Sequence, residues 1–467
     1  MTVEPGEQVE LAGRSHGSEP RLSSWARARL DRLLSLWPYL VDPRVGVINE
    51  VFEVTPDEDE PNFFHYLSEA CDTTAFAPLG NFRNNGGVSS DRYTAIAKAI
   101  GEAVERYCSA IFSYADLTYS SYRDLGRRAA HPESFALYRP KQLAAPKFPW
   151  KPFLVDTPVH WSSGVSLVDG EETLVPAAMV YVPFHYRRSR DDTPIVQPIS
   201  TGLASGCSFA EAALGGLCEV VERDAFTLMW QASMSRPRIP VESLPDHVSD
   251  LVRRFWDVGV DIHVVDITTD IQIPTIMTVA VGEAATSPAV AVAAATDPSA
   301  SVAAVKSLEE LAHTRKFARQ LMDYTPEVAL DVDAGHPLVT DQRSHLRLYC
   351  AQHTKSFAEF SWSSPERRAF DTVVSWHHES AEAALAGAVQ AVKEVGSDVI
   401  ACDLTTPDIR SLGLRVVRVV VPGAHPLFMG YRTRALGGAR LYTVPQRLGE
   451  RGIQPGEADN PNPHPFP

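Results

Sequence analysis

The 467-residue sequence predicts a mixed α/β fold. Three observations lead to this prediction: short runs rich in β-branched residues, longer segments with apolar residues at helical spacing, and the alternation of the two kinds along the chain. The composition, 44% hydrophobic and 22% charged, is ordinary for a globular protein, and the length suffices for two lobes or one large α/β domain.

In the first half of the chain, apolar periodicity alternates with polar segments. We expect helices over 23–37, 93–112 and 209–230, and strands over 45–54 and 173–184. Pro176 and Pro183 would place the last of these strands at a sheet edge. Glycine-containing segments over 80–90 and 197–206 are expected to be loops, each leading into a long helix. Residues 1–20 are expected to form a mobile arm.

The second half of the chain continues the alternation. We expect strands over 261–268, 275–281, 289–295, 399–405 and 414–421, and helices over 303–322 and 381–395. No linker is evident after residue 60. We therefore expect an N-terminal extension over 1–60, partly mobile, and one large domain over 61–467.

Charge, hydropathy and cysteine usage exclude several classes of protein. The net charge of −15 argues against non-specific nucleic-acid binding, which needs basic surface. No apolar run approaches the length of a membrane span, and the N-terminus lacks a signal-peptide core. The six cysteines show no CxxC spacing, so a reducing cytoplasm is the simplest setting.

A Glu-x-x-Glu-Arg pattern occurs twice, each time in a helix that follows a small-residue loop. One copy alone is typical of an exposed ion-paired helix face. Two copies favour a site, because clustered carboxylates bind Mg²⁺ and neighbouring arginines bind phosphate oxygens. The residues are Glu102, Glu105 and Arg106 in the first motif, and Glu219, Glu222 and Arg223 in the second.

The last seven residues, 461–467, have proline at every second position. Proline fixes φ and lacks an N–H, so this tail is expected to be a stiff, extended rod. One interpretation is a disordered end or a ligand for another protein. The other is an ordered rod that delivers the carboxylate of Pro467 to a fixed place, and the two Glu-x-x-Glu-Arg helices favour it.

From about Phe63 onward the sequence resembles the YcaO family, specifically its azoline-forming cyclodehydratases. The similar segments are 99–106, 200–206 with 211–224, 306–315, 401–408 with 416–422, and the proline-rich end. The second segment and the tail are the most specific. The chain departs from the family pattern at Val88, where a lysine is frequent, at His313, where glutamine is usual, and at Thr201, where asparagine is usual.

The resemblance implies a fold of two similar sheet-plus-helix lobes that hold ATP and Mg²⁺ between them. Metal binding would fall to Glu102, Glu105, Glu219, Glu222 and Glu310. ATP binding would fall to Ser200, Glu105, Arg106, Glu211, Arg223 and Arg315. The carboxylate of Pro467 would act as the catalytic base or as an orienting group.

The implied reaction converts Cys, Ser or Thr of a ribosomal precursor peptide into thiazoline or (methyl)oxazoline rings, as in antibiotic biosynthesis. The implied partners are a leader-binding protein of the adenylating-enzyme-like, ocin-ThiF type and, after ring formation, a flavin dehydrogenase. A homodimer is a further expectation. Two alternatives stay open: a YcaO enzyme that makes thioamides or amidines, and a non-catalytic scaffold subunit.

Overall fold

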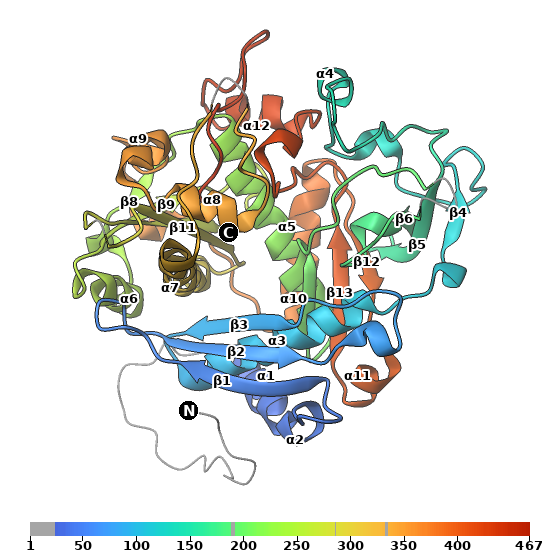
Figure 1. Ribbon diagram of the computed structural model, residues 1–467, viewed down its shortest axis with the longest axis horizontal. Coiled ribbons are helices and arrows are strands. Elements are labelled where there is room, and N and C mark those ends of the chain that lie inside the picture. The colour runs from blue at the N-terminus through green and yellow to red at the C-terminus, as the bar shows by residue number, and fades with distance from the viewer. Residues whose placement is uncertain (1–23, 188–191, 285, 332–334) are drawn as a thin grey trace.

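Three antiparallel sheets surround three long helices in the computed structural model, which describes residues 24–187, 192–284, 286–331 and 335–467 (Figure 1). The arm expected over 1–20 lies outside the described residues. The long helices are α3 (Arg92–Ala110), α5 (Phe209–Gln231) and α7 (Ala300–Tyr324). They confirm the helices predicted over 93–112, 209–230 and 303–322.

The first sheet contains β1 (Ile48–Val54), β2 (Phe64–Ala70) and β3 (Asn84–Ser89), and α3 packs against it. Asp91 caps α3 by accepting a hydrogen bond from the Thr94 amide. The buried face of α3 includes Ala99, Ile100 and Ala103, which join one hydrophobic core with the sheet. Two shorter helices, α1 (Ser24–Ser35) and α2 (Trp37–Leu40), precede β1.

The second sheet has six strands. Its main path is β4 (Thr118–Ser120), β5 (Val159–Ser166), β12 (Ile400–Asp403), β13 (Arg415–Val420) and β7 (Leu203–Gly206), and β6 (Glu172–Pro176) pairs with β5. Helix α5 packs on β7 and β13, and α10 (Ala381–Glu394) packs against α5. The sheet therefore joins segments from opposite halves of the chain.

The third sheet has the order β11 (Val290–Thr296), β10 (Thr275–Val281), β9 (Asp261–Asp266), β8 (Arg238–Ile239). Every residue of β10 and β11 is buried, because α7 covers one face and a second hydrophobic core covers the other. Helix α6 (Asp246–Trp256) packs beside α7. The remaining helices are α4 (Pro140–Leu143), α8 (Gln342–Leu348), α9 (Lys355–Ala358), α11 (Pro407–Ser411) and α12 (Arg440–Arg447).

Three local predictions were wrong. Residues 84–89 are strand β3 and not loop; its two glycines are required by close packing, since a Cβ on Gly87 would lie 2.1 Å from the Ala95 carbonyl oxygen of α3. Residues 203–206, also predicted as loop, form β7. The strand predicted over 173–184 ends at Pro176, after which residues 177–179 form a 3₁₀ turn.

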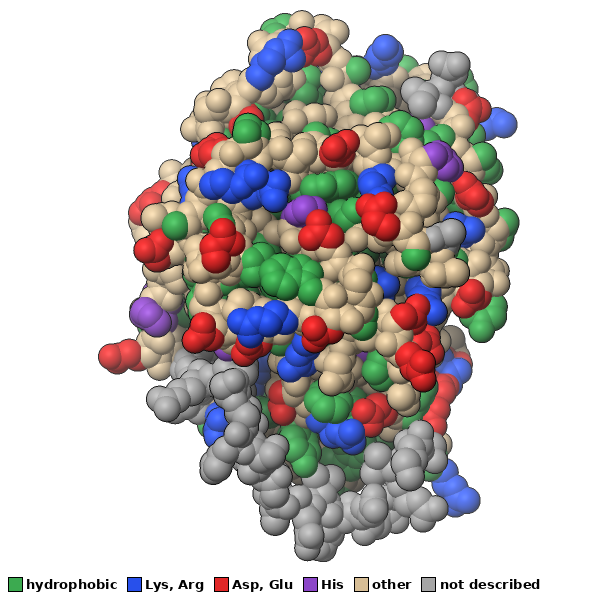
Figure 2. Space-filling view, turned by 90° about the vertical axis from the view of Figure 1, so that its left-hand side faces the viewer, with side chains coloured by type: hydrophobic (Ala, Val, Ile, Leu, Met, Phe, Trp, Pro, Cys, Tyr) green, Lys and Arg blue, Asp and Glu red, His purple; other side chains and the backbone are tan. Residues whose placement is uncertain are grey.

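Figure 2 shows the face at the left of Figure 1, where Lys and Arg side chains are interspersed with Asp and Glu. Among its described residues this face has no extended basic tract of the kind that non-specific nucleic-acid binding needs. Within the described ranges, no helix is both long enough and apolar enough to cross a membrane.

Candidate active site

A cavity of about 2720 Å³ lies where α3, α5 and α7 approach one another. Its lining brings together nearly all the residues singled out in the sequence. Those that line it are Glu102, Glu105, Arg106, Ser200, Glu211, Glu219, Glu222, Arg223, Glu310 and Pro467. Helices from distant parts of the chain thus deliver both Glu-x-x-Glu-Arg motifs to one place.

In the first motif, Glu102 connects α3 to the neighbouring strand β3. Its Oε2 accepts a hydrogen bond of 2.7 Å from the Gly86 amide, and its Oε1 accepts one of 3.2 Å from Arg106 Nη2. Arg106 Nη1 also lies 3.5 Å from Glu105 Oε1. The arginine is therefore held between the two glutamates of its own helix.

The second motif repeats this geometry on α5. Glu219 Oε2 accepts a hydrogen bond of 2.9 Å from the Gly202 amide, and its Oε1 accepts one of 3.4 Å from Arg223 Nη2. Arg223 Nε lies 3.7 Å from Glu222 Oε1. In both motifs the first glutamate binds a glycine amide in the preceding segment, and the arginine lies between the two glutamates. The repeated Glu-x-x-Glu-Arg pattern in the sequence therefore corresponds to a repeated arrangement in the structure.

The carboxylates of the two motifs act on each other electrostatically. Burial raises the pKa of Glu105 well above its usual range, and Glu219 and Glu102 raise it further while Arg106 opposes the shift. Burial raises the pKa of Glu222 to about 8, with Glu219 and Glu310 adding repulsion and Arg223 opposing it. Such crowding of acidic groups is relieved when a cation binds among them.

The two arginines have nitrogen atoms that form ion pairs at most and make no hydrogen bond within the protein. Arg106 Nη1, Arg223 Nε and Arg223 Nη1 are buried and have no hydrogen-bond partner in the protein. A buried N–H without an acceptor is costly, and phosphate oxygens are the acceptors that guanidinium groups bind best. These donors therefore fit the phosphates of a nucleotide.

The carboxylates fit a metal ion that is shared with such phosphates. Among the described residues, no group of three or more His, Cys, Asp or Glu side chains is placed so that protein ligands alone could hold a metal ion. Mg²⁺ does not require this, because it is commonly bound through one or two carboxylates plus phosphate oxygens and water. The donor set thus suits a Mg²⁺–nucleotide complex.

Helix α7 adds an ionic network to the cavity wall, in which Lys98 and Glu309 are residues that the sequence reasoning missed. Lys98 Nζ lies 2.8 Å from Glu309 Oε2 and 3.8 Å from Glu310 Oε1. The same ammonium donates a 2.9 Å hydrogen bond to the Val88 carbonyl oxygen. A lysine charge is therefore present at the strand position where the sequence has Val88. The sequence did indicate this charge, because Lys98 lies one helical turn before Glu102 in the predicted helix.

Arg418 on β13 is a second residue that the sequence reasoning missed. It is buried, its Nη1 donates a 2.9 Å hydrogen bond to the Ile199 carbonyl oxygen, and its Nε has no partner. Burial lowers the pKa of Arg418 to about 10, while Glu219 opposes this shift. An arginine between valines in the middle of strand β13 was the available signal.

The remaining predicted ATP ligands differ in their placement. Ser200 lies on the cavity wall before β7, and Glu211 Oε2 accepts a 2.8 Å hydrogen bond from the Cys207 amide at the start of α5. Arg315 does not line the cavity; its buried Nη2 donates to Ser287 Oγ at 3.0 Å. It is five residues after Glu310, which turns it about 140° around α7.

The two other departures from the family pattern, His313 and Thr201, both line the cavity. His313 lies close to β3, since a Cβ on Gly86 would approach its Cε1 to 2.7 Å. These residues therefore remain able to contact a ligand in the cavity.

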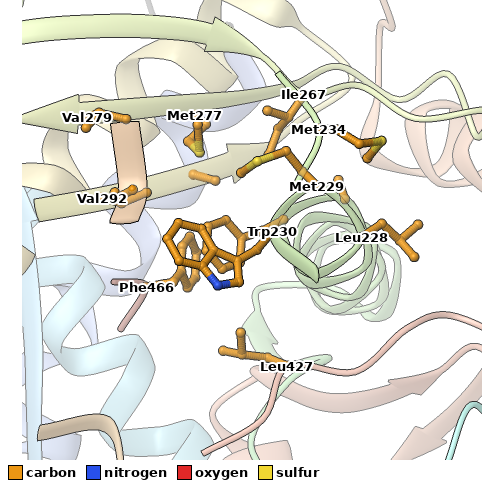
Figure 3. Packing of buried hydrophobic residues seen from close by; sticks show 14 of the residues in the cluster. Leu228, Met229, Trp230, Met234, Ile267, Met277, Val279, Val292, Leu427 and Phe466 are labelled. Carbon is orange, nitrogen blue, oxygen red and sulfur yellow. The ribbon is translucent and has the colours of Figure 1, made fainter. Parts of the chain in front are cut away.

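The proline-rich tail is ordered and enters the same cavity. Phe466 is 1% exposed, and both Phe466 and Pro467 line the cavity. The Phe466 ring lies in the hydrophobic core that also contains Trp230 and residues of β10 and β11 (Figure 3), with its centroid 4.2 Å from that of Phe226. The prediction of an ordered tail that approaches the two motifs is confirmed, while the chemical role of Pro467 stays a prediction.

Comparisons with known proteins agree with this geometry. The family model of the YcaO cyclodehydratases, described as ATP- and Mg²⁺-binding, matches residues 86–425. An uncharacterized protein of Methanothermobacter thermautotrophicus is 29% identical over 345 residues, which cover 72% of this chain and 80% of that protein.

Two solved structures have a similar fold. A heterocyclase in complex with substrate and cofactor superposes with a TM-score of 0.72 at 23% identity, covering 97% of this chain and 59% of that one. A YcaO protein from Methanopyrus kandleri, bound with AMPPCP and Mg²⁺, superposes with a TM-score of 0.60 at 20% identity, covering 84% of this chain and 90% of that one. This chain thus spans less than two thirds of the substrate-bound heterocyclase.

Proposed function

The chain belongs to the YcaO family of ATP- and Mg²⁺-binding proteins, and from this premise we propose that it is an ATP-dependent peptide cyclodehydratase. Its substrate is a ribosomal precursor peptide. Its products are thiazoline or (methyl)oxazoline rings made from Cys, Ser or Thr and the preceding backbone amide.

The reaction requires an amide oxygen to leave. The substrate side chain attacks the preceding carbonyl carbon and gives its proton to a base, and the resulting oxyanion takes the γ-phosphoryl group. Phosphate then departs with the former amide oxygen as the C=N bond forms and the amide proton leaves. ATP with Mg²⁺, when bound, supplies that phosphoryl group and offsets its charge.

The residues of the cavity have distinct tasks in this proposal. Arg106 and Arg223 bind phosphate oxygens through the N–H groups that lack protein partners. Metal binding falls to the carboxylates of the two motifs with Glu310, and Ser200 and Glu211 contribute to the nucleotide site. The carboxylate of Pro467 accepts or orients the proton of the attacking side chain.

One observation carries the proposal: the end of the tail and both Glu-x-x-Glu-Arg motifs line a single cavity. A phosphate site alone would suit many ATP-using enzymes. An additional carboxylate, brought to that site by a stiff segment, supplies the base that cyclisation needs and ATP binding does not. This combination favours a cyclodehydratase.

Mass spectrometry of a Cys-, Ser- and Thr-rich precursor peptide, incubated with the protein, its partner, ATP and Mg²⁺, tests the proposal. We expect the loss of one water for each ring, with one ATP consumed. Exchange of oxygen for sulfur would identify a thioamide-forming enzyme instead. An unchanged peptide together with tight partner binding would identify a scaffold subunit.

Partners follow from the same proposal. The precursor is presented by a leader-binding protein of the adenylating-enzyme-like type, and a flavin dehydrogenase can oxidise the rings after they form. Size-exclusion chromatography with light scattering tests the remaining expectation of a homodimer.

A further inference from the structure

Aromatic and imidazole side chains hold the tail by donating hydrogen bonds to its backbone. Five consecutive backbone carbonyls, from Asn460 to His464, each accept a hydrogen bond from an aromatic or imidazole side chain. In order, the donors are Tyr431, His336, Trp230, Tyr349 and His345, at 3.2, 2.8, 3.0, 2.5 and 2.8 Å. We call these five donors the carbonyl ladder.

The ladder answers a need created by the composition of the tail. Proline has no N–H, so a chain with proline at every second position cannot pair through a regular pattern of backbone donors. The N–H groups of Asn462 and Phe466 are used inside the tail, by Asn460 Oδ1 and His464 Nδ1. Carbonyl oxygens are therefore the backbone groups through which the tail is bound to the rest of the protein.

Two side chains of the tail fix its register. The His464 ring stacks on the His345 ring with centroids 3.9 Å apart, and its Nε2 donates to the Phe428 carbonyl oxygen at 3.0 Å. Two residues later, Phe466 packs against Phe226. A slip of one residue would place a proline ring where each of these side chains packs.

The imidazoles are set in single tautomers. Because a carbonyl oxygen only accepts, His345 carries its proton on Nδ1 and His336 carries its proton on Nε2. The other ring nitrogens, His345 Nε2 and His336 Nδ1, are buried and have no hydrogen-bond partner. Both histidines therefore donate to the tail in a fixed direction.

We propose that the carbonyl ladder is a positioning device that sets where the carboxylate of Pro467 lies in the cavity, with His345 and Tyr349 as its positioning residues. This inference rests on the proposed cyclodehydratase function. The two residues are the donors closest to the end of the tail, at His464 and Pro463. Loss of either donor lets the last residues shift, and misplacement by about 1 Å is enough to cost up to about a hundredfold in rate.

The test compares variants that remove a donor with variants that keep one. His345→Leu and Tyr349→Phe each remove a donor at little cost in volume, whereas His345→Asn keeps an N–H near the place of Nδ1. Tyr186→Phe is the control, because it removes a tyrosine hydroxyl that does not line the cavity; this hydroxyl donates to the Val196 carbonyl oxygen at 2.7 Å and accepts from the Ile195 and Val196 amides. For each variant, kcat and KM for ring formation are measured on a synthetic precursor peptide with purified partner, together with Kd for Mg²⁺–ATP.

We expect kcat to fall roughly ten- to hundredfold in His345→Leu and Tyr349→Phe, while KM for peptide and Kd for Mg²⁺–ATP change by less than about twofold. His345→Asn should recover most of the rate, and Tyr186→Phe should have the wild-type kcat. The inference is overturned if kcat is unchanged in both donor-free variants or if kcat falls as far in Tyr186→Phe as in them. It is also overturned if kcat of His345→Asn is no higher than that of His345→Leu.

A second readout does not depend on activity. Hydrogen–deuterium exchange at the amides of residues 462, 464 and 466 reports whether the tail is held. We expect faster exchange in His345→Leu and Tyr349→Phe than in the wild type and in Tyr186→Phe. If the wild type forms no ring, the proposed function fails. The exchange data then test, independently of activity, whether the ladder holds the tail in place. Faster exchange in the donor-free variants supports this role, and equal exchange overturns it.

Discussion

The guanidinium carbon of Arg223 lies 4.6 Å from the centroid of the Phe466 ring, so an arginine of the second motif contacts the C-terminal tail directly. Arg223 is bound on its other side by Glu219 and Glu222. The group that we expect to bind phosphate and the segment that ends in Pro467 are therefore parts of one packed unit. Displacing the tail should disturb nucleotide binding as well as proton transfer.

Replacing Phe466 by leucine tests this contact. The substitution keeps an apolar side chain but removes the aromatic face, and a partly desolvated cation–π pair contributes about 0.5–2 kcal/mol. We expect Kd for Mg²⁺–ATP to rise several-fold in calorimetric titration. Phe360→Leu is the matched control, because Phe360 packs on Trp230 in the same core. An unchanged Kd in Phe466→Leu would show that the contact does not support the nucleotide site.

Glu222→Gln tests the metal assignment. The substitution removes a carboxylate while keeping its shape, so we expect ATP turnover to fall by at least about a hundredfold with the fold intact. Because burial raises the pKa of Glu222 to about 8, its charge is costly in the absence of a cation, and the variant should unfold at no lower temperature than the wild type. Phosphate release is measured beside Glu382→Gln, an exposed control on α10. Undiminished phosphate release would refute the assignment.

Arg418→Met tests a residue outside the sequence motifs. Removing this buried charge takes away one of the cations near Glu105 and Glu219, which keep Arg106 and Arg223, and the loss of one partner from a buried ionic network costs about 3–5 kcal/mol. We expect a lower free energy of unfolding in urea and weaker Mg²⁺–ATP binding. Arg415→Met on the same strand is the control, since Arg415 donates to the carbonyl oxygen of the adjacent Leu414. Equal stability of the two variants would contradict the inferred role.

Acid should destabilise the protein between about pH 6.5 and 4. Burial lowers the pKa of His345 to about 4, so in this range the unfolded chain binds a proton that the native chain does not. The free energy of unfolding then falls as pH falls, by up to about 1.4 kcal/mol per pH unit for each such histidine. Burial also lowers the pKa of His425 to about 4, which adds to the slope.

The variant His345→Asn isolates this contribution, because asparagine does not titrate. Urea unfolding measured at several pH values should give a shallower slope for the variant than for the wild type. Identical slopes would show that His345 does not titrate differently in the two states.

The sequence was sufficient to predict the helices and strands whose apolar residues follow a clear pattern. The helices that carry Glu102 and Glu219 were predicted from apolar residues at helical spacing, and the strands over 275–281 and 289–295 from runs of apolar residues, which the structure buries throughout. The shared cavity followed from the repeated motif. Its geometric repetition, with a glycine amide bound to each first glutamate, could not be foreseen from spacing.

The predictions that were wrong, and the residues that were missed, have physical explanations. Strand β3 was predicted as loop because its glycines and asparagines have low strand propensity, whereas its formation depends on close approach to α3. Lys98 and Arg418 act through contacts with Glu309 and Glu219 that are distant in the sequence. The carbonyl ladder was equally hidden, since its donors come from four separate segments and recognise backbone atoms.

The central claim is that the carboxylate of Pro467 takes part in cyclisation, and its most direct test is to remove that charge alone. A semisynthetic chain that ends in the amide of Pro467 keeps every contact of the tail and loses only the carboxylate. Rates of ring formation are compared with those of the free acid, at equal Mg²⁺–ATP affinity and equal exchange at the tail amides. We expect ring formation to fall by about a hundredfold or more, the scale of a lost general base. Ring formation at the full rate by the amidated chain would contradict the account.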